Sequence, residues 1–336
     1  MKKIICIILT ICMLILPFSA CKDKNRDDNT IRLTEVTHSI FYAPLYVAIE
    51  NGYFKDEGLN ISLSNGGGAD KCMTAILSGS ADVGLFGPEA AIYVHLGGRK
   101  DLPKVFAQLT KRDGSFLVSR VDEKRTFSWQ NLKDKEIIAG RRGGVPAMTL
   151  EYVLNNNGLF DKQNVTLNYD IQFNLTAAAF IGGTGDYVTM FEPTASECEQ
   201  NGNGYVVASV GKESGEVPYT CFCALQSYIG KNNAKIEKFV KAMYKAIDYT
   251  LSTDAEEVAK AIQGQFPATS IESLKRSIEM YKEIDAWVTN MSMTETALNN
   301  LQTIMERAGE LEKRVSHDAL TLNDVSDKIY AQSHKE

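Results

Sequence analysis

One histidine and two aromatic residues near the N-terminus could bind a small molecule. His38, Phe41 and Tyr42 precede a short helical pattern that begins near Pro44. Aromatic faces give contact area with little loss of side-chain entropy, and a histidine donates or accepts a hydrogen bond according to its tautomer. A loop or capping role for His38, and core packing for the two aromatic residues, remain open as alternatives. All three are candidate ligand contacts.

A second candidate group ends an apolar run, Phe86-Gly87-Pro88-Glu89. Gly87 suits a helix N-cap and Pro88 suits the first turn, so free backbone amides there could hold an anion or a carbonyl. Glu89 could bind an amino group or a ring N–H of a ligand, or could only interact with the helix dipole. We therefore take Phe86, Gly87 and Glu89 as candidate binding residues.

Two arginines and two glycines form a third group, Arg141-Arg142-Gly143-Gly144, between a strand-like run and a helical pattern. Glycines let the backbone approach a ligand closely, and either arginine could grip a sulfonate, a carboxylate or a phosphate. Two surface arginines are the alternative reading. Arg141, Gly143 and Gly144 are the candidates from this group.

Four further candidates stand where strand-like runs begin or end: Gln108, Phe173, Glu192 and Tyr219. Ligands of open α/β sheets bind outside the carboxyl ends of the strands, which is where such residues gather. The four histidines of the sequence form no close-spaced ligand set with cysteines or carboxylates. We therefore expect neither a metal site nor a cofactor.

The elements that position these residues follow one plan twice. Asn51-Gly52-Tyr53-Phe54 is echoed by Asn157-Gly158-Leu159-Phe160, and the Gly-x-Asp corner at Asp82 is echoed at Asp186. Strand-like runs alternate with helical ones, which predicts an α/β fold with two lobes and mostly parallel sheets. We expect one lobe from residues 31–114 with 216–336, and the other from residues 115–215. The two crossings near 112–116 and 213–219 would form a hinge, and the helical C-terminal segment would cover one lobe.

The N-terminus has the pattern of a secretory signal, with two lysines ahead of an apolar run from Ile4 to Phe18 that is short for a transmembrane helix. The run ends at Phe18-Ser19-Ala20-Cys21, which resembles the lipobox of bacterial lipoproteins. That resemblance implies a signal peptide over 1–20, lipid on Cys21, a flexible tether over 21–30 and a place on the outer face of the cell membrane. An ordinary cleavage site is the alternative.

Charge and cysteine spacing exclude some partners. The net charge is −6 and the sequence shows no basic stripe, which argues against nucleic acid. Cys221 and Cys223 stand two apart in a strand-like run, so they point to the same face and are poorly placed to bond each other. We read them as small core or pocket residues, and disulfides among Cys72, Cys198 and this pair stay open.

Four stretches together carry a family resemblance: HSIFYAPLYVAIENGYFKDEGLNISL, GGGADKCMTAILSGSADVGLFGPEA, LKDKEIIAGRRGGVPAMTLEYVL and GTGDYVTMFEP. From about residue 31 to 285 the chain is similar to the solute-binding proteins of ABC importers that handle sulfonates, taurine and thiamine-pyrimidine precursors. The resemblance implies a type II periplasmic-binding fold that closes on a solute and delivers it to permease and ATPase subunits. It also implies that His38, Phe41, Tyr42 and Glu192 line the cleft. We expect the protein to be a monomer and not to be an enzyme.

The nature of the solute is open at this level. Glu89, Glu192 and the aromatic residues favour a nitrogen heterocycle such as a thiamine-pyrimidine precursor, whereas Arg141 and Arg142 favour a sulfonate or taurine. We favour the heterocycle slightly. Eukaryotic pyrimidine-forming enzymes share the fold family and carry a Cys-rich motif, of which Thr220-Cys221-Phe222-Cys223 resembles a part. Such a synthase, or a sensor lipoprotein without a transport role, is the alternative function.

Overall fold

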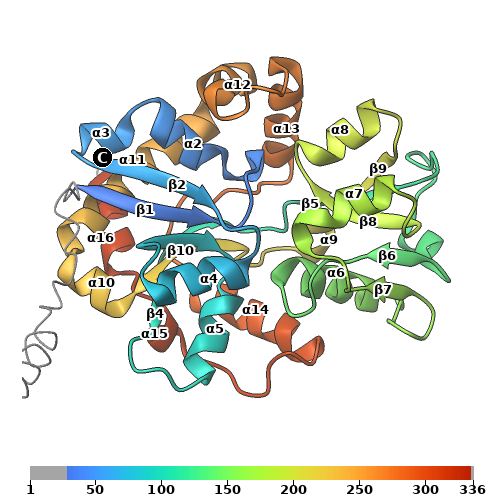
Figure 1. Cartoon of the computed structure of the whole chain (residues 1–336), viewed down its shortest axis with the longest axis horizontal. Coiled ribbons are helices and arrows are strands. Elements are labelled where there is room, and N and C mark those ends of the chain that lie inside the picture. The colour runs from blue at the N-terminus through green and yellow to red at the C-terminus, as the bar shows by residue number, and fades with distance from the viewer. Residues whose placement is uncertain (1–28, 334–336) are drawn as a thin grey trace, which may run out of the picture.

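The computed structural model describes residues 29–333, which form two five-stranded sheets side by side (Figure 1). The first sheet has the order β2-β1-β3-β10-β4, with bounds β1 Thr30–Glu35, β2 Asn60–Asn65, β3 Val83–Phe86, β4 Pro103–Thr110 and β10 Thr220–Leu225. The second has the order β7-β6-β8-β5-β9, with bounds β5 Ser115–Ser119, β6 Glu136–Ile138, β7 Thr166–Asn168, β8 Tyr187–Phe191 and β9 Tyr205–Ser209. We call each sheet with its helices a lobe.

The two sheets share one topology, as the repeated sequence plan predicts. In each, four strands run in one direction and the fifth opposes them: β10 pairs antiparallel with β3 and β4, and β5 with β8 and β9. The opposed strand is in each case the one that follows a crossing from the other lobe. The predicted α/β class with mostly parallel sheets is confirmed, and the antiparallel strand in each sheet is the consequence of the two crossings.

Helices cover both lobes. On the first lobe lie α2 (Ala43–Glu50), α3 (Tyr53–Asp56), α4 (Ala69–Ser78), α5 (Glu89–Leu96), α10 (Gln226–Lys231), α11 (Asn233–Ser252), α12 (Ala255–Ile262), α15 (His317–Leu320) and α16 (Asp324–Ser333). On the second lie α6 (Val145–Asn156), α7 (Thr176–Ile181), α8 (Thr194–Gln200) and α9 (Val210–Ser214). The described residues also form the 3₁₀ helices η1 (Ile40–Tyr42), η2 (Trp129–Leu132), η3 (Phe173–Leu175) and η4 (Gln263–Gln265).

Matching glycines and aspartates hold the repeated units. Gly52 and Gly158 follow the caps of α2 and α6 with φ of 76° and 73°, the left-handed region in which glycine commonly ends a helix. The Asp82 carboxylate accepts the amide of Arg32 in β1, and the Asp186 carboxylate accepts the amide of Glu136 in β6, both at 2.9 Å. Each aspartate therefore bonds the first strand of its unit across the corner.

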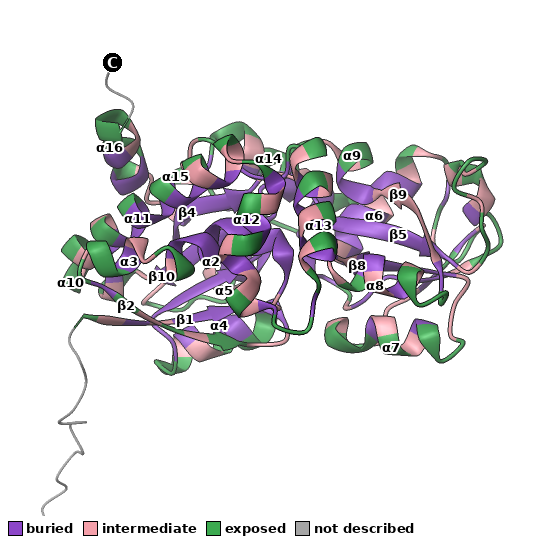
Figure 2. Cartoon of the chain, turned by 90° about the horizontal axis from the view of Figure 1, so that it is seen from above, coloured by how far each residue is buried: buried purple, intermediate pink, exposed green. Residues whose placement is uncertain are grey.

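One face of α11 is an apolar stripe that is buried in the core of the first lobe. In α11 the side chains of Ile236, Phe239, Val240, Met243 and Ile247 are fully buried, and the helix packs on α2, α3 and α16. Full burial of an aliphatic or aromatic side chain contributes about 1.5–3 kcal/mol, so this stripe holds α11 on the first lobe. Figure 2 shows buried residues along the strands of both sheets.

The C-terminal segment does not stay on one lobe. Helix α13 (Ile271–Glu283) contacts η1 of the first lobe and α8 of the second, and α14 (Glu295–Arg307) contacts α6. Between them, residues 286–291 run beside β4, where the amides of Lys111 and Gln108 bond the carbonyls of Ala286 and Met291. This pairing at the free edge of β4 places α13 at the seam between the sheets, where both views show it (Figures 1 and 2). The expectation of a single covered lobe was wrong.

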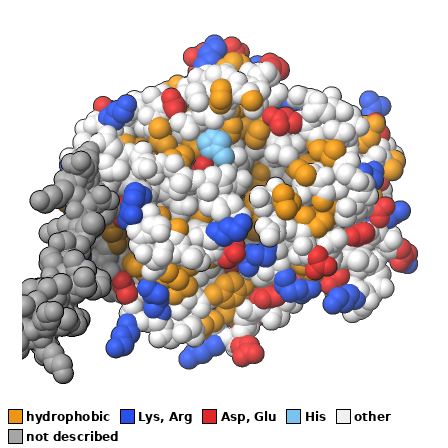
Figure 3. Space-filling view, in the orientation of Figure 1, with side chains coloured by type: hydrophobic (Ala, Val, Ile, Leu, Met, Phe, Trp, Pro, Cys, Tyr) orange, Lys and Arg blue, Asp and Glu red, His pale blue; other side chains and the backbone are white. Residues whose placement is uncertain are grey.

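None of the helices over residues 29–333 is both long enough and apolar enough to cross a membrane. Within the same residues, Cys72, Cys198, Cys221 and Cys223 are buried and none of them forms a disulfide. On the face drawn in Figure 3, basic and acidic side chains are interspersed.

Candidate functional site

A cavity of about 230 Å³ lies between the two lobes, at the carboxyl ends of β1, β3, β6, β7 and β8. The first lobe contributes Val36, Tyr42, residues 67–71, Gly87 and Glu89; the second contributes Arg141, residues 144–146, residues 169–173 and Phe191; the strand after the second crossing contributes Tyr219 and Thr220. A cavity walled by both lobes at the strand ends is where an open α/β sheet binds its ligand.

Seven of the thirteen candidate residues line this cavity. They are Tyr42, Gly87, Glu89, Arg141, Gly144, Phe173 and Tyr219. The other six, His38, Phe41, Phe86, Gln108, Gly143 and Glu192, lie outside its lining. The difference between the two groups is set by what each side chain meets in the fold.

Glu89 provides a buried acidic group in the cavity. Its side chain begins α5 and is 1% exposed, and its Oε2 has no hydrogen-bond partner among the described residues. Burial raises the pKa of this carboxyl to about 8, although Arg141 and the backbone amides of Glu89, Val145 and Ala90 oppose the rise. Near neutral pH the carboxyl is therefore mostly protonated, and it can both donate and accept a hydrogen bond.

Gly87 is needed where it stands because Glu89 folds back over it. A Cβ on residue 87 would lie 2.1 Å from Oε2 of Glu89 and 2.9 Å from a methyl of Val145 in the other lobe. Any larger residue would displace the carboxyl or push the lobes apart. The glycine thus lets the Glu89 carboxyl reach the N-terminus of α6 across the cleft.

Aromatic rings form much of the remaining wall. Tyr42, Tyr169, Phe173, Phe191 and Tyr219 all line the cavity. The rings of Phe173 and Phe191 meet edge to face with centroids 5.7 Å apart, and the Phe191 and Tyr219 centroids are 6.1 Å apart. Such rings give a flat solute a large contact area at low entropic cost.

The arginines of the third candidate group are already paired. Nε of Arg141 lies 3.6 Å from Oδ1 of Asp70 across the cleft, with the two side chains 40% and 54% exposed. Arg142 stacks on Tyr169 at 3.9 Å and pairs with Asp161. Arg141 therefore links the lobes at a solvated position, and an exposed pair of this kind is weak.

His38 and Glu192 both line a separate cavity of about 170 Å³, which shares Phe173 and Phe191 with the first cavity. The His38 ring bonds Glu35 and the carbonyl of Gln265. The Glu192 carboxylate accepts the amide and the hydroxyl of Ser196 at the start of α8. Burial raises the pKa of Glu192, and the bonds from Ser196 oppose that rise.

The other candidates outside the lining serve packing or other contacts. Phe41 and Phe86 are fully buried in the core, and Phe41 backs the cavity with its ring 5.6 Å from Phe191 and 5.7 Å from Tyr219. Gln108 lines a third cavity of about 410 Å³ beside residues 216–218. Gly143 accepts a hydrogen bond from Tyr93 of the first lobe at 2.9 Å.

The cavity lining includes residues that the sequence patterns did not single out, above all residues 67–71 and 169–172. The first of these loops follows β2 and the second follows β7, and the two strands occupy the same position in their sheets. The repeated plan contained this signal. Aligning the two repeats places the loop after β2 opposite the loop after β7, and this alignment would have identified both loops as cavity residues.

Comparisons with known proteins agree with this architecture. The model of the NMT1/THI5-like family matches residues 40–257. The Bacillus subtilis (strain 168) protein YtlA, whose name marks it as a candidate binding protein, is 42% identical over 319 residues, which cover 95% of each chain. The 4-amino-5-hydroxymethyl-2-methylpyrimidine phosphate synthase of Aspergillus parasiticus is 26% identical over 240 residues, 68% of each chain.

A solved structure shows the same fold at low sequence identity. The alkanesulfonate-binding protein SsuA from Xanthomonas axonopodis pv. citri, bound to MOPS, superposes with a TM-score of 0.71 at 17% identity and covers 89% of this chain and 99% of its own. At that identity the likeness bears on the fold alone. With two lobes on one topology, a cavity between them and a family match over most of the chain, this protein belongs to the NMT1/THI5-like family and has the fold of the solute-binding proteins of ABC importers.

Proposed function

We propose that this chain is the extracytoplasmic solute-binding component of an ABC importer, and that its solute is a small nitrogen heterocycle of the aminopyrimidine type. The Glu89 carboxyl is the observation that favours this solute class. It is buried in the interlobe cavity, and its Oε2 lacks a partner among the described residues. An amino group beside a ring nitrogen offers one donor and one acceptor, which matches a protonated carboxyl. A buried polar atom without a partner costs about 1–3 kcal/mol, and such a solute would remove that cost.

A sulfonate is the less favoured solute. It would place a negative charge beside Glu89 in the buried part of the cavity. The guanidinium of Arg141, which would have to receive it, is half-exposed and paired with Asp70. The aromatic lining also favours a flat ring over a tetrahedral anion.

Lobe closure accounts for capture without chemistry. The solute would touch Glu89 and Tyr42 on one lobe and Phe173 and Phe191 on the other, so it would bind the closed arrangement better than an open one. The permease and ATPase subunits of the importer would then recognise the closed form. The proposal includes a lipid anchor on Cys21, which lies outside the described residues 29–333.

A synthase on this fold is disfavoured by the position of the thiols. Cys221 and Cys223 lie in β10 with 0% and 1% exposure, and neither lines the cavity. Burial raises the pKa of both thiols, which keeps them protonated and poorly reactive. The cysteine pair is thus core packing rather than a reactive group that faces a substrate.

The test is calorimetric titration of residues 22–336 with 4-amino-5-hydroxymethyl-2-methylpyrimidine, an alkanesulfonate and nitrate. We expect the pyrimidine to bind. Glu89→Gln keeps a donor and an acceptor and should weaken binding by less than about tenfold, whereas Glu89→Leu removes both hydrogen bonds and should weaken it by about 10- to 100-fold. Glu123→Gln, a carboxyl outside the cavity that bonds Tyr187 and Asn131, is the matched control. Sulfonate binding that survives Glu89→Gln and is lost in Arg141→Ala would reverse the assignment.

The anchor has its own test. In a bacterial host, the full chain should fractionate with membranes and carry lipid by mass spectrometry, and Cys21→Ser should release it. Membrane association that persists in Cys21→Ser would contradict the anchor and leave the solute proposal intact.

A further inference from the structure

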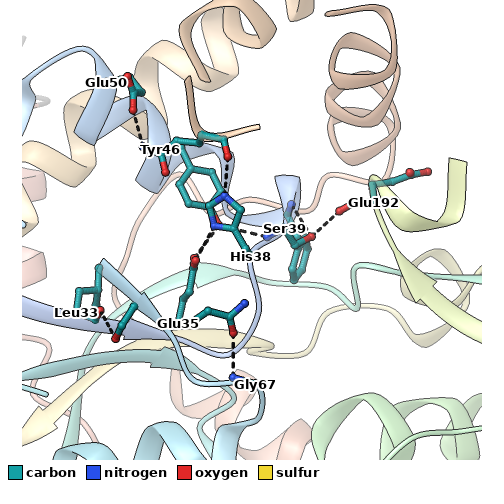
Figure 4. Close-up of polar contacts among 12 residues, drawn as sticks. Leu33, Glu35, His38, Ser39, Tyr46, Glu50, Gly67 and Glu192 are labelled. Carbon is teal, nitrogen blue, oxygen red and sulfur yellow. Dashed lines mark hydrogen bonds and ion pairs between the residues drawn. The ribbon is translucent and has the colours of Figure 1, made fainter. Parts of the chain in front are cut away.

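Both ring nitrogens of His38 face hydrogen-bond acceptors (Figure 4). Nδ1 lies 2.7 Å from Oε1 of Glu35, and Nε2 lies 2.9 Å from the backbone carbonyl oxygen of Gln265. A carbonyl oxygen can only accept, so Nε2 must carry a proton to make this bond. The bond at Nδ1 then needs a second proton, shared between the imidazole and the carboxylate.

The surroundings of Glu35 favour placing that proton on the imidazole. Glu35 is 1% exposed, and its other oxygen accepts the hydroxyl of Tyr46 at 2.6 Å. The hydrogen bond to Glu35 raises the pKa of His38, and partial burial opposes the rise. With an imidazolium, Nδ1–H donates to the Glu35 carboxylate and Nε2–H donates to the Gln265 carbonyl, so both bonds form at once.

Two aromatic rings enclose the His38 ring. Phe266 stacks on it with centroids 4.6 Å apart and planes 28° apart, and Tyr46 lies at 4.8 Å with planes tilted by 55°. Aromatic faces attract a cation within about 6 Å of the ring centroid. The packing therefore supports the charged form, as the hydrogen bonds do.

The segment that His38 holds carries part of the solute cavity. Val36 and Tyr42, two residues before it and four after it, line the cavity. Ser39, the next residue, caps η1 and donates a hydrogen bond of 2.6 Å to the carbonyl of Glu192 in the second lobe. A change at His38 is thus next to the interlobe contact between Ser39 and Glu192 (Figure 4), in a segment that contributes two residues to the cavity lining.

We propose that His38 is a positioning residue for the solute cavity: as an imidazolium it ties residues 36–42 to the turn at Gln265, and solute affinity falls when rising pH removes its second proton. A neutral ring must give up one of the two bonds. The segment loses either its tie to β1 through Glu35 or its tie to η4 through Gln265. The effect on affinity rests on the proposed function, whereas the protonation of the ring does not.

The other groups around the ring do not supply a competing positive charge. From β1 it meets Glu35, from α2 the ring of Tyr46, and from the end of η4 the Gln265 carbonyl and the Phe266 ring. The Gln265 side chain itself bonds Glu50 of α2. Beside the smaller cavity, the Glu192 carboxylate is taken up by Ser196.

The sign of the pH effect follows from the raised pKa. The folded, tied segment holds the proton more tightly than a free histidine, so the stabilisation is complete below the ordinary value of about 6.5. It is lost as pH rises through the raised value. Affinity should fall about tenfold for each pH unit by which solute binding raises the pKa of His38.

The experiment is a pH titration of the full residues 22–336 with ¹⁵N-labelled histidine, followed by long-range ¹H–¹⁵N NMR. We expect both His38 nitrogens to be protonated with a midpoint above 6.5, while His95, whose pKa is lowered by burial, is neutral near pH 7. The indole N–H of Trp287 donates to the carbonyl of Phe41 at 2.8 Å and should shift with the same midpoint. His38→Gln identifies the resonance and should abolish the Trp287 shift.

The controls separate the role of His38 from that of other titrating groups. His95→Gln removes a histidine that also bonds a backbone carbonyl, that of Pro103, and should leave the Trp287 shift intact. Because Glu89 titrates in the same range, the pH dependence of pyrimidine affinity is compared between wild type and His38→Gln, and the difference is assigned to His38. A high midpoint with a coupled Trp287 shift but no solute binding would support the positioning role and refute the proposed function. A midpoint at or below 6.5, or a Trp287 shift that survives His38→Gln, overturns the proposal.

Discussion

At the scale of single residues, the buried carboxyl of Glu89 lowers the stability of the fold while it offers a group for solute binding. Its Oε2 has no partner among the described residues, and burial raises its pKa to about 8. The folded protein therefore binds a proton that the unfolded chain has released, over the range between the ordinary carboxyl value and about 8. In that window stability falls as pH rises, because folding must either hold the proton or bury the charge.

This sign gives a prediction for Glu89→Gln without solute. The amide cannot ionise, so the variant should have the same free energy of unfolding as wild type near pH 4.5. At pH 8.5 its free energy of unfolding should exceed that of wild type by more than about 1 kcal/mol. The reason is that a carboxyl pKa raised by one pH unit on folding costs about 1.4 kcal/mol once the group is ionised in the unfolded chain. Urea denaturation at the two pH values measures it. Glu123→Gln should show no such gain. A wild-type protein whose stability is flat over this range would contradict the buried-acid description.

Arg141 supports a second prediction at this scale. Its pair with Asp70 is exposed, and exposed pairs contribute about 0–1 kcal/mol. Arg141→Ala should therefore weaken aminopyrimidine binding by no more than about fivefold. Titration calorimetry of Arg141→Ala and Asp70→Asn in parallel measures this, and a loss of about a hundredfold in Arg141→Ala alone would mean that the guanidinium holds the solute directly.

At the scale of elements, α13 is a helix of the described residues that contacts both lobes. It contacts η1 and α8, and its Tyr281 is fully buried. The Tyr281 hydroxyl accepts the amide of Glu192 at 2.9 Å and donates to the carbonyl of Gly114 at 3.2 Å. A single hydroxyl thus satisfies backbone groups at the end of β8 and in the first crossing.

Tyr281→Phe should test this role of α13. Removing the hydroxyl leaves two buried backbone groups unpaired, each at a cost of about 1–3 kcal/mol, so we expect a clear loss in the free energy of unfolding and weaker solute binding. Tyr53→Phe, which removes a hydroxyl that accepts a hydrogen bond from the exposed side chain of Asn51, should stay within about 0.5 kcal/mol of wild type. Equal effects of the two substitutions in urea denaturation would show that α13 does not couple the lobes.

At the scale of the whole molecule, short contacts across the cleft hold the lobes together. Ser39 donates to Glu192, Tyr93 donates to Gly143, and Arg141 pairs with Asp70. Closing the lobes therefore requires no solute-specific chemistry, and the solute adds to contacts that the protein already makes. A typical hydrogen bond contributes about 0.5–1.5 kcal/mol, so the two neutral bonds together bias closure by about 1–3 kcal/mol.

The double variant Ser39→Ala with Tyr93→Phe should shift the free protein toward an open form. We expect a larger radius of gyration by small-angle X-ray scattering, which saturating solute returns to the wild-type value. Ser227→Ala, which removes a hydroxyl bonded to Asp101 away from the cleft, is the control. A radius of gyration unchanged by the double variant would mean that other contacts hold the lobes together.

The sequence by itself determined the fold class and several positions around the cavity. The repeated Asn-Gly and Gly-x-Asp signals are local, so they fix where strands end and helices begin in both lobes, and Gly87, Glu89 and Gly144 follow from those ends. The apolar stripe of α11 was readable for the same reason, since its period depends only on neighbours three and four residues apart.

Only the tertiary structure decided which polar groups remain free for a solute. Ser196 takes up the Glu192 carboxylate, Asp70 pairs with Arg141, and His38 bonds a carbonyl 227 residues away in the chain. Among the charged candidates His38, Glu89, Arg141 and Glu192, all within the described residues, Glu89 alone has a buried side-chain oxygen without a hydrogen-bond partner. Hydrogen-bond partners are chosen by proximity in space, and no local pattern encodes proximity between residues so far apart in sequence. The same reason explains why the sequence places α13 on one lobe, although the pairing of residues 286–291 beside β4 sets this helix between the two.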